Sequence, residues 1–126
     1  MHRELLYKDL SYRLVGLAYE IDNKIGYGHR EKIYADAFEE LLKRETNLFK
    51  REVYYPIKNE GKTLAKRFFD FLVDDKIVIE VKVGDREYKN SCYQLFEYLK
   101  TSQLKLGLIV RFTRDGVKIK RIPNYY

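Results

Sequence analysis

The amino-acid sequence predicts an α/β fold in which a mixed β-sheet is flanked by helices. Two segments with apolar residues at helical spacing come first, and three segments rich in β-branched and aromatic residues follow them. Another helical segment then precedes two further apolar segments. Consecutive strands, then a helix, then more strands are typical of a mixed sheet with helices packed on it, so the predicted order is α-α-β-β-β-α-β-β.

The two N-terminal helices are indicated by apolar residues three and four positions apart. The first is predicted over 10–25, with Asp9 or Ser11 as its N-cap and with glycines after its last residue. The second is predicted over 30–44, where two basic residues suit the negative end of the helix dipole. Each helix therefore has one apolar stripe to bury.

Five strands and a third helix complete the prediction. The strand over 76–83 is a near-continuous run of isoleucine and valine, which favours a central position in the sheet, whereas the last strand is expected at an edge. If Asp74 and Asp75 are the two loop residues before it, Asp70 lies opposite Ile79, although a slip or bulge would change this register. The other segments are strands over 49–57, 64–73, 104–112 and 117–122, and a helix over 91–100.

The composition indicates one domain, predicted over 1–126, and an anionic partner. Hydrophobic residues make up 45% of the chain, which is enough for a compact core. The formal charge of +6 and the pI near 9.3 favour nucleic acid as the partner, although a solvated surface accounts for the charge equally well. Cys92 is the one cysteine, so an internal disulfide is excluded, and we expect it to fill the core. No signal peptide or membrane-spanning run is recognisable, so a cytoplasmic location is expected.

Three charged residues stand out because they interrupt apolar strands. Glu80 and Lys82 are two positions apart, so both project from the same face of their strand. Asp70 lies in the preceding strand, among phenylalanines, where propensity disfavours an aspartate. The short turn brings Asp70 close to Glu80. A surface ion pair between Glu80 and Lys82, with Asp70 at a strand edge, is the alternative interpretation.

The chemistry that suits this set is phosphodiester hydrolysis. Two neighbouring carboxylates repel each other, and a divalent cation relieves that repulsion, with Mg²⁺ or Mn²⁺ suited to hard oxygen ligands. Such a metal polarises a phosphate and lowers the pKa of a bound water. A lysine beside it can orient the water or stabilise the charge that develops on phosphorus.

These residues resemble a known superfamily. Asp70, followed after nine residues by Glu80-Val81-Lys82, is similar to the core motif of the PD-(D/E)XK nucleases. Residues 28–34, GHREKIY, resemble the signature of the small GxxExxY proteins, a family placed in that superfamily. The resemblance extends over about residues 10–122 and implies a restriction-endonuclease-like core around a central mixed sheet.

The resemblance also implies roles for individual residues. Glu31, Asp70 and Glu80 match the metal-binding carboxylates, which would hold Mg²⁺ or Mn²⁺, and Lys82 matches the catalytic lysine. Glu31 also has a simpler explanation, because acidic residues favour helix N-termini.

Gln94 and Tyr98 match an element that sits beside the site in some nuclease branches and contacts nucleic acid. They share one helix face, four positions apart. Gln94 also has the right spacing for a capping box with Ser91. Tyr34, within the GxxExxY match, lies on an apolar stripe and is expected in the core.

The predicted function is therefore that of a metal-dependent nuclease acting on nucleic acid, with DNA favoured over RNA. The alternative is an inactive nucleic-acid-binding or protein-interaction module that retains the nuclease fold. Because the chain has little surface beyond its core, a homodimer or a partner protein would supply more of the recognition surface. No membrane partner is expected.

Overall fold

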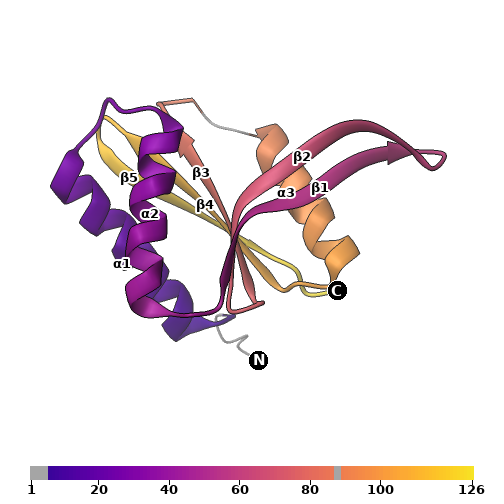
Figure 1. The fold of residues 1–126 in the computed structure, drawn as a ribbon, viewed down its shortest axis with the longest axis horizontal. Coiled ribbons are helices and arrows are strands. Elements are labelled where there is room, and N and C mark those ends of the chain that lie inside the picture. Colours follow the sequence, from indigo (N-terminus) through magenta and orange to yellow (C-terminus); the bar gives the residue numbers. More distant parts are fainter. Residues whose placement is uncertain (1–5, 87–88) are drawn as a thin grey trace.

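The computed structural model describes residues 6–86 and 89–126, and its elements follow the predicted order (Figure 1). Each element begins or ends within a few residues of its predicted bounds. The helices are α1 (Lys8–Ile25), α2 (Glu31–Glu45) and α3 (Lys89–Ser102), and the strands are β1 (Phe49–Asn59), β2 (Lys62–Val73), β3 (Ile77–Val83), β4 (Leu106–Thr113) and β5 (Gly116–Pro123).

The five strands form one mixed sheet in the order β1-β2-β3-β4-β5. The pair β3–β4 is parallel, because α3 connects the two strands, and the other three pairs are antiparallel. The prediction that the isoleucine- and valine-rich strand is central and the last strand is at an edge is confirmed.

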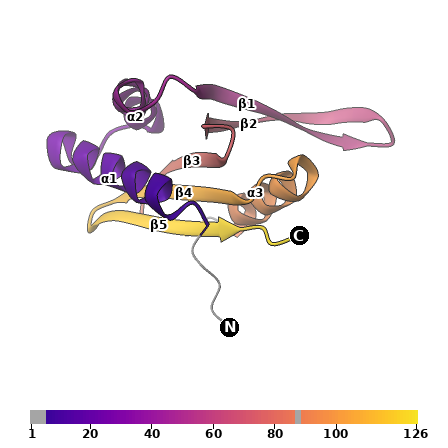
Figure 2. The same cartoon turned by 90° about the horizontal axis from the view of Figure 1, so that it is seen from below.

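Two apolar clusters lie on opposite faces of this sheet. α1 and α2 pack on one face, where Ile77, Ile79 and Val81 of β3 are buried, whereas Val78 is buried on the other face with leucines of α3. Figure 2 shows α1 and α2 lying together, away from α3. Alternation along β3 therefore fills both sides of the sheet and places Glu80 and Lys82 on the Val78 side. Cys92 is partly buried and packs against the cluster that contains Val78.

The predicted caps of α1 are wrong. The N-cap residue is Tyr7, which makes no side-chain cap hydrogen bond, and both Asp9 and Ser11 lie inside the helix. Ser11 Oγ donates instead to the carbonyl of Lys8 at 3.2 Å and accepts a hydrogen bond from Arg121 of β5 at 2.8 Å. The serine thus fixes α1 on the sheet rather than starting the helix.

Tyr34 positions the start of α2. Its side chain is fully buried, as predicted, and its ring stacks on Phe112 with centroids 4.1 Å apart. The hydroxyl donates to the carbonyl of Gly26 at 2.6 Å, which ties the α1–α2 loop to the second helix. Gly28 in this loop has φ +112°, a conformation that favours glycine. The loop therefore fixes where Glu31 begins the helix.

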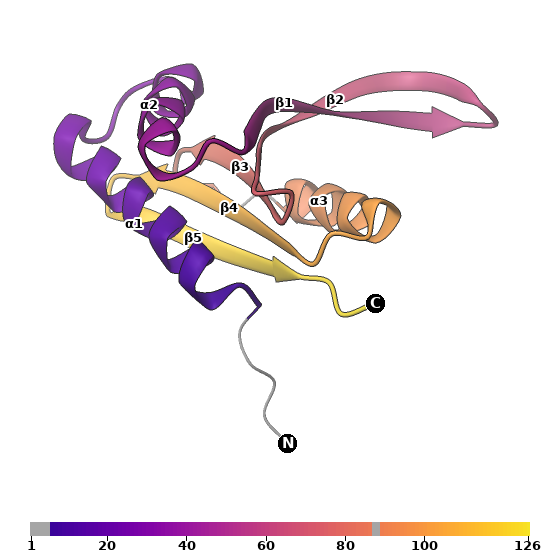
Figure 3. The same cartoon turned by 60° about the horizontal axis from the view of Figure 1, so that its bottom comes forward.

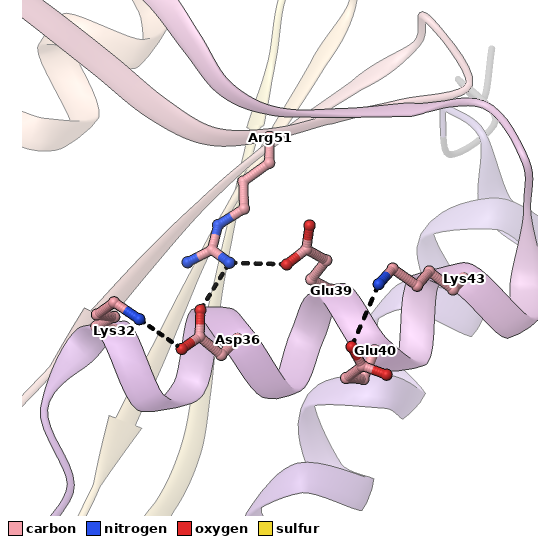
Figure 4. A network of polar contacts seen from close by, with 6 residues as sticks. All are labelled: Lys32, Asp36, Glu39, Glu40, Lys43 and Arg51. Carbon is pink, nitrogen blue, oxygen red and sulfur yellow. Dashed lines mark hydrogen bonds and ion pairs between the residues drawn. The ribbon is translucent and has the colours of Figure 1, made fainter.

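β1 and β2 form a long hairpin that extends beyond the rest of the sheet (Figure 3). Its base is held by Arg51, whose Nη1 donates to Asp36 at 2.7 Å and to Glu39 at 2.9 Å, both on α2 (Figure 4). Hydrogen bonds from the basic side chains of Lys32 and Arg51 lower the pKa of the Asp36 carboxyl. β1 is thus attached to α2 by charge as well as by packing.

The turn between β2 and β3 contains three residues rather than the predicted two, because Lys76 belongs to the turn. Asp74 and Asp75 both have positive φ, and the Lys76 N–H donates to the carbonyl of Val73 at 2.9 Å. Val73 consequently pairs with Ile77.

In the parts of the chain that the structure describes, no helix is long and apolar enough to cross a membrane.

Candidate active site

The site begins where β2 and β3 separate. Their ladder ends with the pair Phe71–Ile79, and one step farther along the same register Asp70 faces Glu80. The predicted register, with Asp70 opposite Ile79, is therefore wrong by one residue. This shift of one residue matters, because directly paired residues project from the same face of the sheet. The observed register therefore turns Asp70 toward Glu80.

Asp70 also stabilises the point where the strands part. Its Oδ2 accepts a hydrogen bond from the Val81 N–H at 2.6 Å. This N–H lies beyond the last backbone pair of the ladder and needs an acceptor, because a buried N–H without one is costly. The Asp70 carboxylate supplies it and is thereby held at the end of the paired region.

The carboxyl of Glu80 is protonated at neutral pH. Burial is the main cause that raises its pKa to about 9, from an ordinary value of 4.5. A hydrogen bond with Asp70 and the charge of Asp70 raise this pKa further, whereas the charge of Lys82 lowers it. The Glu80 carboxyl therefore keeps its proton beside Asp70, as expected for an acid that is buried next to a like charge.

Lys82 and Glu31 complete the group of predicted residues. Lys82 Nζ lies 4.0 Å from Glu31 Oε1, and the Lys82 side chain is only 21% exposed. Glu31 also acts electrostatically on Glu80 and raises its pKa. Asp70, Lys82 and Glu31 thus all act electrostatically on Glu80, and Lys82 and Glu31 lie within ion-pair distance of each other. However, in residues 6–86 and 89–126 no three acidic, histidine or cysteine side chains are close enough to form a metal-binding group.

The two predicted residues on α3 differ in what surrounds them. Tyr98 packs against Tyr55 and Phe69 of the hairpin, with ring centroids 5.2 and 5.1 Å away, and burial raises the pKa of its hydroxyl. Gln94 is partly buried one turn earlier on the helix. The capping-box interpretation of Gln94 is wrong, because α3 begins at Lys89 and Ser91 lies inside it.

One basic residue of the site region was expected to contribute to the attraction of nucleic acid but was not predicted as part of the site. Arg111 on β4 pairs directly with Lys82 on β3, and its Nη1 donates to the carbonyl of Arg86 at 2.9 Å. The available signal was the one that singled out Asp70 and Glu80, a charged residue within an apolar strand. Sequence reasoning did not apply it to β4.

The comparisons with known proteins agree with this arrangement. A family model described as "PD-(D/E)XK nuclease superfamily" matches residues 8–122. The chain belongs to this superfamily. The match spans all the helices and nearly all of the last strand, so Asp70, Glu80 and Lys82 lie within the matched range.

A solved structure supports the same fold. The crystal structure of SSO0001 is 25% identical in sequence and superposes with a TM-score of 0.55. The match covers 94% of the present chain but only 57% of SSO0001, so SSO0001 is the longer protein. No curated protein matches the chain.

Divalent metals are typical of PD-(D/E)XK nucleases, and the donor set here suits one. Asp70 and Glu80 offer hard carboxylate oxygens within hydrogen-bonding distance of each other. Glu31 reaches Lys82 rather than this pair. The structure therefore provides two candidate ligands side by side and a third acid nearby.

Proposed function

We propose that the chain is a metal-dependent nuclease domain that hydrolyses phosphodiester bonds in nucleic acid, with DNA preferred over RNA. The observation that carries this proposal is the position of Asp70 and Glu80, which face each other within hydrogen-bonding distance beside Lys82, where β2 and β3 separate. Superfamily membership and the charge of +6 support it.

The two carboxylates are the proposed ligands of Mg²⁺ or Mn²⁺, and Glu31 is the proposed third ligand once its side chain turns from Lys82. The metal would polarise the phosphate and lower the pKa of a bound water. Holding the metal requires Glu80 to release its proton, because only the carboxylate is a good ligand.

Lys82 is the proposed catalytic residue. It lies two positions after Glu80, so both side chains leave the same face of β3. Its ion-pair distance to Glu31 and its low exposure keep the ammonium near the carboxylates. There it would stabilise negative charge on the reacting phosphate. Gln94 and Tyr98 are proposed to contact the nucleic acid from α3.

The finer assignment to the GxxExxY proteins rests on the loop before α2. Tyr34 and Gly28 fix this loop, and Glu31 follows from it as the first residue of the helix. We propose that the motif exists to hold Glu31 near Lys82.

The test is a cleavage assay on single-stranded, duplex and branched DNA and on matching RNAs, with Mg²⁺, with Mn²⁺ and with EDTA. Lys82→Ala should reduce cleavage by about a hundredfold or more, as loss of a charge stabiliser at a transition state does. Lys43→Ala is the matched control, because this exposed lysine forms an ion pair with Glu40 near the end of α2. It should cleave like the wild type.

Asp70→Asn should lose metal-dependent cleavage, because an amide is a poorer ligand than a carboxylate for a hard cation. Circular dichroism must first show that the variants are folded. If the wild type cleaves none of these substrates with either metal but binds them, the chain is a binding module that retains the nuclease fold. Equal cleavage by wild type and Lys82→Ala would remove the lysine from the mechanism.

A further inference from the structure

A basic pocket lies between the start of α3 and the strands β4 and β5. Its volume is about 430 Å³, which is within the range of small-ligand sites. The lining residues that the structure describes include four cations and no acid. They are Lys89, Cys92, Tyr93, Ile109, Arg111, Lys118, Ile119 and Lys120.

The strand register makes this pocket continuous with the candidate active site. β4 lies between β3 and β5, and directly paired residues of neighbouring strands project from the same face. Two rows of paired residues therefore cross the sheet from the site to the pocket. These rows are Glu80–Ile109–Lys120 and Lys82–Arg111–Lys118.

The two rows also set the distance between the carboxylate pair and the pocket. Neighbouring strands are about 4.8 Å apart, so the pocket begins roughly 10 Å or less from the carboxylate pair. Arg111 stands between the two, with its guanidinium held by the carbonyl of Arg86. A phosphate chain that passes Lys82 would therefore meet Arg111 and then the lysines of β5.

The pocket combines the two chemical features of a nucleotide. Its cations suit phosphate oxygens, and its lining also includes the ring of Tyr93, which is 70% exposed, and the apolar side chain of Ile109. Aromatic side chains next to basic residues are the usual platform on which unpaired bases stack. In a continuous duplex both faces of a base are already covered, so a duplex would use only the cations.

We propose that this pocket binds one unpaired nucleotide of the substrate strand, adjacent to the bond that is cleaved. This inference rests on the proposed nuclease function and specifies its substrate as a strand that is single-stranded at the site. Lys118 and Lys120 hold phosphates, and Tyr93 stacks on the base.

The test measures binding without cleavage, by fluorescence anisotropy in EDTA. The probes are a labelled strand of about 12 thymidines, an abasic strand with the same phosphates, and a blunt duplex of the same charge. Tyr93→Ala should weaken binding of the thymidine strand by about 5- to 150-fold, because that is the range for loss of one stacked base. It should leave binding of the abasic strand unchanged. Tyr12→Ala is the matched control, because Tyr12 is 80% exposed on α1.

The double variant Lys118→Ala/Lys120→Ala should weaken binding of both strands. The slope of log affinity against log salt should become shallower by about 1.4, since each contact to a single strand contributes about 0.7. Lys43→Ala should leave this slope unchanged. If Tyr93→Ala weakens the abasic and thymidine strands equally, or if neither pocket variant affects binding, the nucleotide site is wrong.

The two proposals fail separately. Cleavage by a protein whose pocket variants bind normally would refute the pocket and leave the nuclease function. Base-dependent binding by a protein that never cleaves would refute the nuclease function and leave the pocket.

Discussion

Replacing Glu80 with glutamine should stabilise the metal-free protein, and increasingly so as the pH rises. The folded wild type keeps the Glu80 proton up to about pH 9, whereas the unfolded chain loses it near its ordinary value of 4.5. Between these values the folded state binds more protons than the unfolded state, so the unfolding free energy falls as the pH increases. The stability that comes from the Glu80 proton is fully present below about pH 4.5, and it is lost as the pH approaches about 9.

The slope gives the magnitude. A difference of one bound proton between the folded and unfolded states changes the unfolding free energy by about 1.4 kcal/mol per pH unit. Moving from about pH 5.5 to about pH 7.5 therefore removes about 3 kcal/mol of stability from the wild type. The amide of Glu80→Gln resembles the protonated acid in shape and can still hydrogen-bond to Asp70, yet it does not titrate. The variant should therefore gain about 3 kcal/mol relative to the wild type across this interval.

Urea unfolding in EDTA at the two pH values measures this difference, provided that the m-value stays constant. Glu40→Gln is the matched control, because Glu40 is an exposed acid on α2, and its effect should be the same at both pH values. A Glu80→Gln effect that is also independent of pH would refute the reasoning, because it would mean that the Glu80 carboxyl does not keep its proton in the folded state.

Four further outcomes follow from the structure. The affinity for Mg²⁺ should rise by up to about tenfold per pH unit near neutrality, because Glu80 must release its proton to the buffer, and calorimetry in two buffers detects that proton. Gly107→Ala should lower the unfolding free energy by about 1–3 kcal/mol, since its Cβ would lie 2.7 Å from Leu95 of α3. Gly16→Ala, where a Cβ meets open space within α1, should instead raise it by up to about 1 kcal/mol in the same urea titration. Tyr34→Phe should cost about 0.5–1.5 kcal/mol by removing a hydrogen bond to the α1–α2 loop, measured by thermal unfolding.

Much of the fold could be predicted because its signals are local or periodic. The near-continuous apolar run of β3 predicted its central place, and the alternation of side chains along the strand predicted the shared face of Glu80 and Lys82. Both clusters of the core follow that alternation. The buried position of Tyr34 followed from its helical stripe. These features depend on the period of the pattern alone, which the sequence displays directly.

The register of β2 against β3 could not be predicted, because it depends on contacts that are distant in sequence. Asp74 accepts a hydrogen bond from Thr46 at 2.6 Å, and its N–H donates to the carbonyl of Leu48 at 2.8 Å. These bonds from the α2–β1 loop hold Asp74 in the turn, and Lys76 then closes it. For the same reason the pocket beyond Arg111 was not foreseen, since it arises from strand pairs and a helix that meet only in the fold.

The register connects the acidic pair to the basic pocket in one electrostatic arrangement. Asp70 and Glu80 stand at one end of the paired rows, and the lysines of β5 stand at the other, with Arg111 between them. A phosphate chain is attracted to the β5 end and repelled by whatever negative charge remains on the pair, and protonation of Glu80 already halves that charge. A divalent cation at the pair would neutralise the two carboxylates, so in the proposed nuclease metal and nucleic acid should each strengthen the binding of the other, as reciprocal linkage requires.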